Sequence, residues 1–314
     1  MQRSPLWAAS PERMQIRTCS TKSFRVSASV NSSIHRLNRA EKTIQRRRYS
    51  MTVRVHGKKP YRAAVVHGGP GAIGSAAGLA KGLAEYCGVM EPLQSEHTVN
   101  GQIEELKGQI TSFNGGSPLV LIGHSWGAWL CAMTAAKYPE LASKLILVDS
   151  GPLTEQHVPQ IEMRRLSHFT DGEKKRYHTL LAELEQKDSA AKDRLLEQLG
   201  ALCEKADTYR ETALPGDAVT LDGEMYSRVF PEAAEIRKTG QLLHLFDRIR
   251  CPLCIIHGEY DTHPPDGVTG PLSDKRIGYR FHLLSKCGHT PWREEYARAH
   301  FFKILKREIP AGHN

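Results

Sequence analysis

Short apolar runs alternate with segments of helical periodicity along most of this chain, starting near residue 61. The runs are nearly wholly apolar, as expected of strands that are buried on both faces. Six strands are predicted: Tyr61–Val66, Gly88–Leu93, Leu119–Ile122, Lys144–Val148, Leu253–Ile256 and Tyr279–Leu284. The segments between them predict helices: Ser75–Tyr86, Val99–Phe113, Ala128–Lys137 and Tyr296–Arg307. This alternation predicts an α/β fold, with a mostly parallel sheet and helices on both faces.

The alternation breaks once, between about residues 153 and 240. This block has no convincing strand, but it contains charged helical segments such as Gly172–Lys187 and Ser189–Ala206. We therefore expect a helical cap at 153–240 that separates two parts of one core, residues 51–152 and 241–314. Only residues 52–59 are available for strands ahead of the first clear one, which predicts a trimmed sheet.

The first fifty residues carry the net charge of the chain. They hold 11 of its 43 Lys and Arg but two of its 34 Asp and Glu, which leaves 32 of each kind for residues 51–314. The charge of +9 therefore belongs to this leader, and the neutral remainder lacks the basic face of a nucleic-acid-binding protein. No apolar run approaches the roughly 20 residues that span a bilayer. We expect neither nucleic acid nor a membrane as a partner.

Two interpretations of the leader stay open. Residues 1–50 are rich in Arg and Ser and have no sustained apolar core, which is typical of an organelle transit peptide and not of a secretory signal. Their end, Arg46–Ser50, resembles a mitochondrial processing site. Alternatively, Met51 is the true start and the upstream stretch is spurious. The first interpretation predicts a mitochondrial location, and the second a cytoplasmic one.

The seven cysteines are scattered at irregular spacing, which indicates reduced thiols and not a disulfide framework. Cys251 and Cys254 form a C-x-x-C pair, but no second pair follows at zinc-site spacing. Both lie at the start of a predicted strand, so we interpret them as buried thiols. The chemistry predicted below requires neither a metal nor an organic cofactor.

A nucleophile motif, Gly123-His124-Ser125-Trp126-Gly127, matches G-x-S-x-G between a predicted strand and a predicted helix. A nucleophile on such a turn has strained backbone angles, and side chains two residues to either side would clash. Gly123 and Gly127 meet this requirement. The pattern predicts that the Ser125 hydroxyl stands clear of the sheet at the start of a helix, where negative charge is favoured.

A glycine-rich turn, His67-Gly68-Gly69-Pro70-Gly71, directly follows the strand Tyr61–Val66. It matches neither of the common phosphate-binding glycine motifs. We predict that the backbone N–H groups of Gly69 and Trp126 form an oxyanion hole beside Ser125, because glycines leave that approach open. A plain tight turn is the alternative.

An acid and a base follow the last two predicted strands. Asp261 lies just after Leu253–Ile256, and His289 lies after Tyr279–Leu284. Because the carboxyl ends of parallel strands meet at one edge, we predict a Ser125–Asp261–His289 triad with His289 as the base. Asp149, which ends the strand Lys144–Val148, is the alternative acid.

Four other histidines near strand ends need a separate interpretation. His67, His124 and His257 precede glycines and are interpreted as packing or supporting groups. His263 is close to Asp261 in sequence. It lies in a Pro-rich stretch, however, and we expect it on the wrong side of the last strand to take part.

Four motifs follow one another along the chain: the turn His67–Gly71, the turn Gly123–Gly127, Asp261 and His289. In this order they resemble the α/β-hydrolase fold superfamily over about residues 60–308. His67–Gly71 together with Gly123–Gly127 is similar to the proline iminopeptidase-like branch of serine hydrolases, except that His124 stands where that branch has Gly. The resemblance implies two-step acyl transfer on a small ester, amide or short peptide, and a helical cap between the sixth and seventh strands.

The resemblance also implies where a substrate would bind. In an aminopeptidase, cap carboxylates would pair with the free amino group of the substrate; the candidates are Asp222, Glu224, Glu232 and Glu235, with Glu224 chosen as the substrate-binding residue. Trp129 is expected to line the pocket. Solvated cap acids and a packing role for Trp129 are the alternatives. There are two alternative hypotheses for the function: a carboxylesterase for small acyl esters, and a non-catalytic ligand-binding member of the fold. The sequence predicts no oligomeric state.

Overall fold

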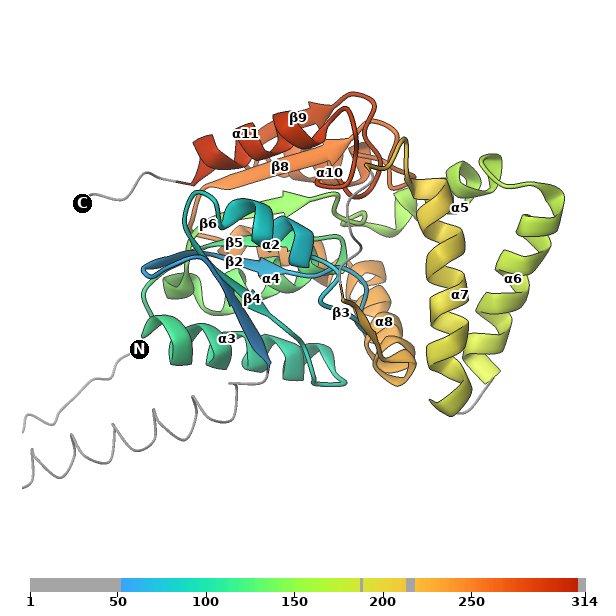
Figure 1. The fold of residues 1–314 in the computed structure, drawn as a ribbon, viewed down its shortest axis with the longest axis horizontal. Coiled ribbons are helices and arrows are strands. Elements are labelled where there is room, and N and C mark those ends of the chain that lie inside the picture. Colours follow the sequence, from blue (N-terminus) through green and yellow to red (C-terminus); the bar gives the residue numbers. More distant parts are fainter. Residues whose placement is uncertain (1–51, 187–188, 213–217, 310–314) are drawn as a thin grey trace, which may run out of the picture. The chain divides into compact units, whose positions relative to one another are not determined.

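The computed structural model of the 314-residue chain describes residues 52–186, 189–212 and 218–309 (Figure 1). The leader at residues 1–50, together with both interpretations of its role and of the location of the protein, lies outside the described residues.

A seven-stranded sheet, in the order β1-β4-β2-β5-β6-β8-β9, runs through the described part of the chain (Figure 1). Its strands are β1 (Val53–His56), β2 (Tyr61–Val66), β4 (Gly88–Pro92), β5 (Leu119–His124), β6 (Ala142–Val148), β8 (Leu253–Gly258) and β9 (Arg280–Leu284). All neighbours are parallel except β1, which pairs antiparallel with β4. The predicted mostly parallel sheet is confirmed. The six predicted strands are present with ends shifted by at most two residues, and β1 is formed by the short segment that precedes them.

The helices lie on both faces of this sheet and in the segment between β6 and β8. They are α2 (Ala77–Leu83), α3 (Val99–Asn114), α4 (Trp126–Lys137), α5 (Val158–Ser167), α6 (Asp171–Gln186), α7 (Ser189–Asp207), α8 (Gly223–Lys238), α9 (Gln241–Leu245), α10 (Asp266–Asp274) and α11 (Arg298–Glu308). Short 3-10 turns occur at Pro139–Leu141, Glu155–His157 and Phe246–Arg248. A two-residue ribbon pairs β3 (Ala72–Ile73) with β7 (Thr220–Leu221). Among the described helices, none has the length and apolar composition needed to cross a bilayer.

The continuous apolar character of the strands follows from burial on both faces. In β2, Ala63 and Val65 pack in a core shared with α2 and α11, whereas Ala64 and Val66 pack in a core shared with α3 and α4. All four side chains are fully buried. Because successive strand residues point to opposite faces, each face needs its own apolar set, and the polar alternation of a half-exposed strand is absent here.

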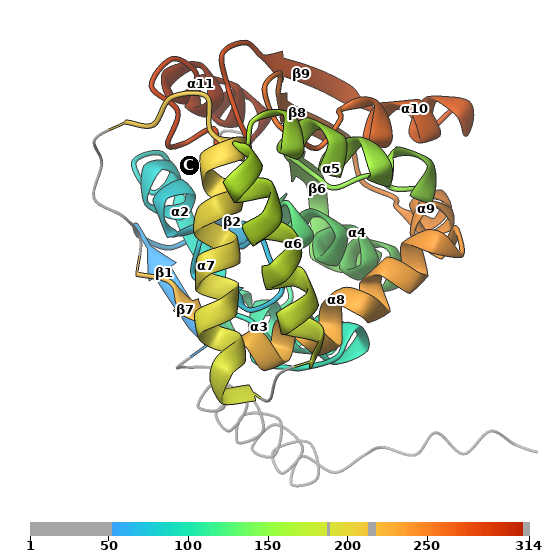
Figure 2. The ribbon, with the colours of Figure 1, turned by 90° about the vertical axis from the view of Figure 1, so that its right-hand side faces the viewer.

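The predicted helical insertion between β6 and β8 is confirmed. In this insertion α6 and α7 lie side by side (Figure 2) and share a small apolar core of their own, which includes Tyr177, Leu180 and Leu199. Helix α8 is different, since Met225 and Val229 on its inner side belong to the main core. The insertion therefore packs on the main core through α8, whereas α6 and α7 share a core of their own.

Candidate active site

Ser125 occupies the sharp turn between β5 and α4, with φ 52° and ψ −117°. A Cβ atom on Gly123 would overlap the carbonyl oxygen of Gly127, and one on Gly127 would overlap the carbonyl oxygen of Val66. The two glycines are thus required by backbone packing. The strained serine conformation persists because buried structure on both sides holds it.

Ser125 opens on a cavity of about 540 Å³. Residues of the sheet edge, such as Gly69 and Trp126, line one part of it, and α5, α6, α7 and α8 supply most of the rest. The predicted pocket residue Trp129 also lines this cavity, where its indole Nε1–H donates to the carbonyl oxygen of Gly151 at 3.0 Å. A substrate entering the cavity would meet Ser125 at the edge of the sheet.

The two predicted oxyanion donors both carry uncommitted backbone N–H groups. Neither the N–H of Gly69 nor that of Trp126 donates a hydrogen bond to any residue that the structure describes. Gly69 has φ 53°, a conformation that favours glycine, and Trp126 is the first residue of α4. The partial positive charge of a helix N-terminus favours a negatively charged oxygen at this position.

Asp261 and His289 meet at the carboxyl ends of β8 and β9. His289 Nδ1 donates to Asp261 Oδ2 at 2.8 Å, and the Asp261 side chain is fully buried. This bond leaves Nε2 of His289 as the basic nitrogen. Ser125 Oγ makes no hydrogen bond to a described residue; a bond between nucleophile and base commonly tightens only when substrate is bound.

The charge states of this pair suit proton transfer. Burial by itself raises the pKa of Asp261, but the imidazoles of His289 and His263 outweigh burial and hold that pKa well below its usual range. Burial lowers the pKa of His289, yet the charge of Asp261 and the hydrogen bond to it raise this pKa above its ordinary value. The result is an ionised carboxylate that supports a strengthened base.

The alternative acid, Asp149, lies buried behind Asp261 and makes no hydrogen bond to His289. Its Oδ1 accepts the backbone N–H of Gly258 at 2.7 Å. Burial first, and then repulsion by Asp261, raise the pKa of Asp149 well above its usual range. Asp149 is therefore placed to be the neutral member of the two carboxyl groups.

His263 lies at the site, contrary to our expectation from the sequence. Its ring Nδ1 and its backbone N–H each lie 2.9 Å from Asp261 Oδ1, and its ring stacks on His289 with centroids 4.5 Å apart. It also lines the cavity. The loop after β8 turns back within two residues, so its Pro-rich sequence does not carry His263 away. The spacing Asp-x-His was the available signal. Asp261 Oδ1 faces His263, and Oδ2 faces His289 at 2.8 Å and His257 Nε2 at 3.3 Å.

His124, which departs from the glycine of the resembled branch, connects the nucleophile turn to the loop of the base. Its Nε2–H donates to the carbonyl oxygen of His289 at 2.7 Å, and its ring meets Trp292 edge to face at 4.7 Å. Burial lowers the pKa of His124 well below the ordinary value, so it is a neutral donor. Nothing in the sequence predicts the contact between His124 and the carbonyl of His289.

A buried ion pair joins the insertion to the same loops. Arg165 of α5 donates through two N–H groups to the carboxylate of Asp207, at 3.1 and 2.6 Å, and also reaches Thr262. The backbone carbonyl of Asp207 accepts the N–H of His289 at 2.8 Å. The C-terminal end of α7 therefore holds the loop that carries His289, a role that its charged helical sequence did not reveal.

The predicted amino-group partner, Glu224, does not line the cavity. Its carboxylate pairs with Arg228 at 2.6 Å and with Lys192 at 3.9 Å, on another side of α8. Asp222 caps α8 by accepting the N–H of Met225. The sequence does not determine how α8 is rotated on the core, and this rotation decides which of its acids face the cavity.

The other two candidate acids, Glu232 and Glu235, do not line the cavity beside Ser125 either. Glu232 accepts the N–H of Val99, and Glu235 is not among the lining residues. The charged side chains that do line the cavity are Glu162, Arg165 and Arg237. None of these three stands out in the sequence from the other charges of its helix.

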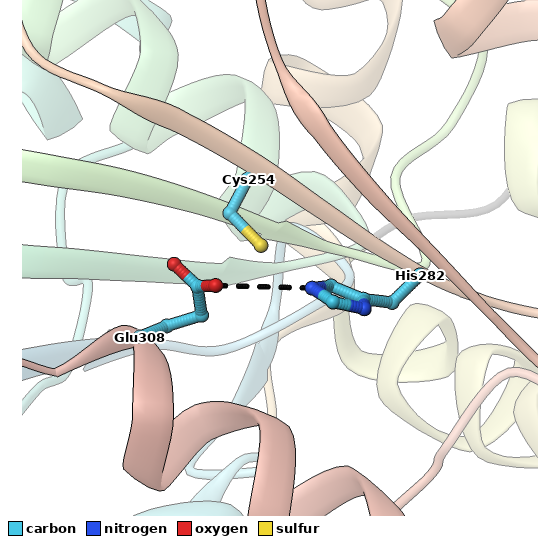
Figure 3. A group of neighbouring side chains, drawn as sticks. All are labelled: Cys254, His282 and Glu308. Carbon is cyan, nitrogen blue, oxygen red and sulfur yellow. Dashed lines mark ion pairs between the residues drawn. The ribbon is translucent and has the colours of Figure 1, made fainter.

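A group of metal-ligand types lies at the other end of the sheet, where Cys254, His282 and Glu308 have ligand atoms within 4.8 Å of one another (Figure 3). The Glu308 carboxylate is already paired with Lys144 at 3.0 Å and with Arg280 at 2.8 Å. Burial raises the pKa of the Cys254 thiol to about 12. Because two cations already hold the Glu308 carboxylate, this is a poor cation site. The two remaining groups share Asp261, whose oxygens accept from imidazoles.

The fold matches that of several solved structures. A crystal structure of VinJ has a TM-score of 0.58 and 17% sequence identity, covering 82% of this chain and 95% of that one. E-2-(acetamidomethylene)succinate hydrolase has a TM-score of 0.55 and 16% identity, over 82% and 94% of the chains. A thermophilic esterase from Thermogutta terrifontis has a TM-score of 0.54 and 16% identity, over 82% and 93%. No curated protein sequence matches this chain significantly.

A family model supplies the sequence counterpart of this fold. The model described as the alpha/beta hydrolase family matches residues 46–299, which include the nucleophile turn, the insertion and the loops of Asp261 and His289. The match covers most of the chain, and the sheet order and insertion agree with it. This chain belongs to the alpha/beta hydrolase family.

Proposed function

We propose that this protein is a serine hydrolase that cleaves a small carboxylic ester through an acyl-enzyme intermediate. The observation that carries the proposal is the link between the strained Ser125 turn at the cavity and the buried Asp261–His289 pair: His124, the residue before Ser125, donates to the backbone carbonyl of His289. The uncommitted N–H groups of Gly69 and Trp126 on the same edge add the second requirement, a place for a negative oxygen.

The reaction proceeds in two halves. Ser125 Oγ bonds to the ester carbonyl carbon while its proton passes to His289 Nε2, and the carbonyl oxygen becomes negative. The N–H groups of Gly69 and Trp126 donate to that oxygen, and each such donor is worth about 10²–10³ in rate. The alcohol leaves with the proton from His289, and the acyl group stays on Ser125. Water then attacks through the same base and releases the acid.

An ester is favoured over a peptide by the surroundings of the cavity. An aminopeptidase of the proline iminopeptidase type needs a carboxylate for the substrate's amino group. The predicted partner, Glu224, is paired with Arg228 outside the cavity, and the carboxylate that does line the cavity, Glu162, has a half-exposed side chain 3.6 Å from His178. Among the similar structures, one is named an esterase and another a hydrolase of a substituted succinate. The insertion helices make most of the remaining wall, and lining side chains such as Ile161, Leu181 and Phe230 suit a short acyl chain.

Replacement of the nucleophile tests the proposal. We expect Ser125→Ala to abolish hydrolysis of p-nitrophenyl butyrate, and to prevent labelling by a fluorophosphonate probe, with little change in the thermal melt. Ser112→Ala, on α3, removes a hydroxyl that makes no hydrogen bond and should leave both signals intact. Turnover retained in Ser125→Ala would exclude this nucleophile. A wild-type protein that neither turns over esters nor takes the probe would instead be a non-catalytic ligand-binding protein.

A panel of substrates separates the ester from the peptide reading. We expect p-nitrophenyl esters to be cleaved with higher kcat/KM than proline p-nitroanilide, whether its amino group is free or blocked. A strong preference for the free-amino proline substrate would overturn the choice of an ester.

A further inference from the structure

Arg237 is a buried cation in the wall of the cavity onto which Ser125 opens. It lies in the last turn of α8 and is 8% exposed. Its guanidinium lies over the ring of Trp129, with 5.5 Å between Cζ and the ring centroid. A cation taken out of water to this degree is costly unless anions and hydrogen-bond acceptors surround it.

The partners of Arg237 within the protein leave much of its donor capacity unused. Its Nε donates to Glu155 Oε2 at 3.0 Å, but the Glu155 side chain is 49% exposed, so water screens this pair. Within the described residues, the two terminal amino groups of Arg237 donate no hydrogen bond. A guanidinium can offer these groups as a fork that matches a carboxylate.

The other charged residues of the cavity do not offer such a fork. Arg165 is committed to Asp207 and Thr262 through three hydrogen bonds. Glu162 is an anion with a half-exposed side chain 3.6 Å from His178, so it offers a carboxylate no donor. Among the described lining residues, Arg237 is therefore the charged side chain whose two terminal amino groups both donate no hydrogen bond.

We propose that Arg237 binds a carboxylate on the acyl part of the substrate, so that the preferred esters are half-esters of short dicarboxylic acids. This inference rests on the proposed ester hydrolysis and adds the class of acyl group. Trp129, over which the guanidinium lies, is in the first turn of α4, directly after Ser125. Ser125 and Arg237 line the same cavity, so one acyl group bound there can reach both. Its ester carbonyl then lies at Ser125, and its far carboxylate replaces water on the terminal amino groups of Arg237.

A pair of chain-matched esters measures this preference. The wild-type kcat/KM for the mono-p-nitrophenyl ester of glutaric acid is compared with that for p-nitrophenyl valerate, which has the same number of acyl carbons and no charge. We expect Arg237→Gln to lower the ratio of the two values by about 10- to 100-fold, mainly through KM for the anionic ester. Lys238→Gln removes the neighbouring exposed cation of α8 and should leave the ratio unchanged.

A second variant tests the inference without altering Arg237. Glu155→Gln removes the carboxylate that competes for the guanidinium, and we expect the ratio to rise. An equal loss for both esters in Arg237→Gln, or a fall in the ratio in Glu155→Gln, would overturn the assignment.

Binding of glutarate itself separates this inference from the proposed function. We expect calorimetry to detect glutarate bound to Ser125→Ala and to detect at least tenfold weaker binding when Arg237→Gln is added. If neither ester is hydrolysed but glutarate binds through Arg237, the proposed ester hydrolysis is excluded and the carboxylate site at Arg237 is supported. If p-nitrophenyl valerate is hydrolysed but glutarate binding does not depend on Arg237, the proposed ester hydrolysis stands and the carboxylate site at Arg237 is excluded.

Discussion

Two aspartates of the site show how neighbours decide the charge of a buried residue. Asp149 and Asp261 are both fully buried and both follow strands of the same sheet. Asp261 accepts hydrogen bonds from the imidazoles of His289 and His263, and these hold its pKa well below the usual range. Asp149 accepts one backbone N–H, and burial together with the charge of Asp261 raises its pKa. Burial is the same for the two, so the partners make the difference.

Substitution of each aspartate by asparagine should separate their roles. We expect Asp261→Asn to lower kcat by about 10⁴-fold, because the amide cannot hold or stabilise a protonated His289. We expect Asp149→Asn to keep kcat within about threefold, because an amide oxygen can still accept from Gly258. Ester hydrolysis by the purified variants is the measurement. Comparable losses in the two would place Asp149 in the mechanism.

The same pair predicts a dependence of activity on pH. His289 must be neutral to accept a proton, and its pKa is raised, so wild-type kcat/KM should fall as the pH drops through a value above the ordinary 6.5. Residual activity in Asp261→Asn should show this fall at lower pH, because the charge that raises the pKa is gone. A profile that does not move would mean that another group sets it.

The contribution of Asp149 to the free energy of unfolding should fall as the pH rises, whereas that of an ion-paired carboxylate rises with pH. Its folded-state pKa is raised, so the stabilisation that it contributes is complete below its unfolded pKa and is lost as the pH rises through the folded value. Asp149→Asn does not titrate. Urea unfolding at several pH values should therefore show the variant gaining stability relative to the wild type as the pH rises.

At the scale of elements, the turn between β5 and α4 depends on its close approach to β2. Gly127 packs against the carbonyl oxygens of Val66 and His67, with no room for a side chain. Gly200, in α7, has nothing within 4 Å of the Cβ position. The same chemical change should therefore have opposite effects at the two glycines.

We expect Gly127→Ala to lower the free energy of unfolding by at least about 3 kcal/mol, because the added Cβ forces β2 and α4 apart. Gly200→Ala should raise it by about 0.5–1 kcal/mol, because alanine favours a helix. Chemical denaturation of both variants measures the difference. A tolerated Gly127→Ala would mean that the turn can relax without cost.

At the scale of the whole molecule, the residues that stabilise the sheet and those proposed for catalysis lie at opposite ends of the strands. Glu308, 4% exposed at the end of α11, pairs with Lys144 of β6 and Arg280 of β9. These pairs connect the last helix to two strands. They touch none of the groups around Ser125.

We expect Glu308→Gln to lower the free energy of unfolding by about 3 kcal/mol, because the buried Lys144 loses its counter-charge. Arg280→Gln should cost less than about 1 kcal/mol, because the Arg280 side chain is 63% exposed. Neither change should alter kcat for an ester. A matching loss of kcat in Glu308→Gln would mean that the two ends of the sheet are coupled.

The parts of this protein that follow local rules were predictable from sequence. Strands buried on both faces appear as apolar runs, and the strained turn at Ser125 needs glycines at fixed positions, so both leave a local pattern. The position of His263 did not, because the direction in which a loop turns depends on what it packs against. The same holds for Glu224, whose place on α8 depends on how that helix is rotated on the core.

The sequence by itself determined the order of strands and helices, the insertion between two strands, and the motifs at the strand ends. Only the tertiary structure decided which side chains meet. It placed two imidazoles on Asp261, put His124 on the carbonyl of His289, and left the guanidinium ends of Arg237 at the cavity wall. Some of these contacts join residues that are far apart in the chain. Others join residues of one loop and depend on the direction in which that loop turns. They depend on packing in three dimensions, which no spacing along the sequence encodes.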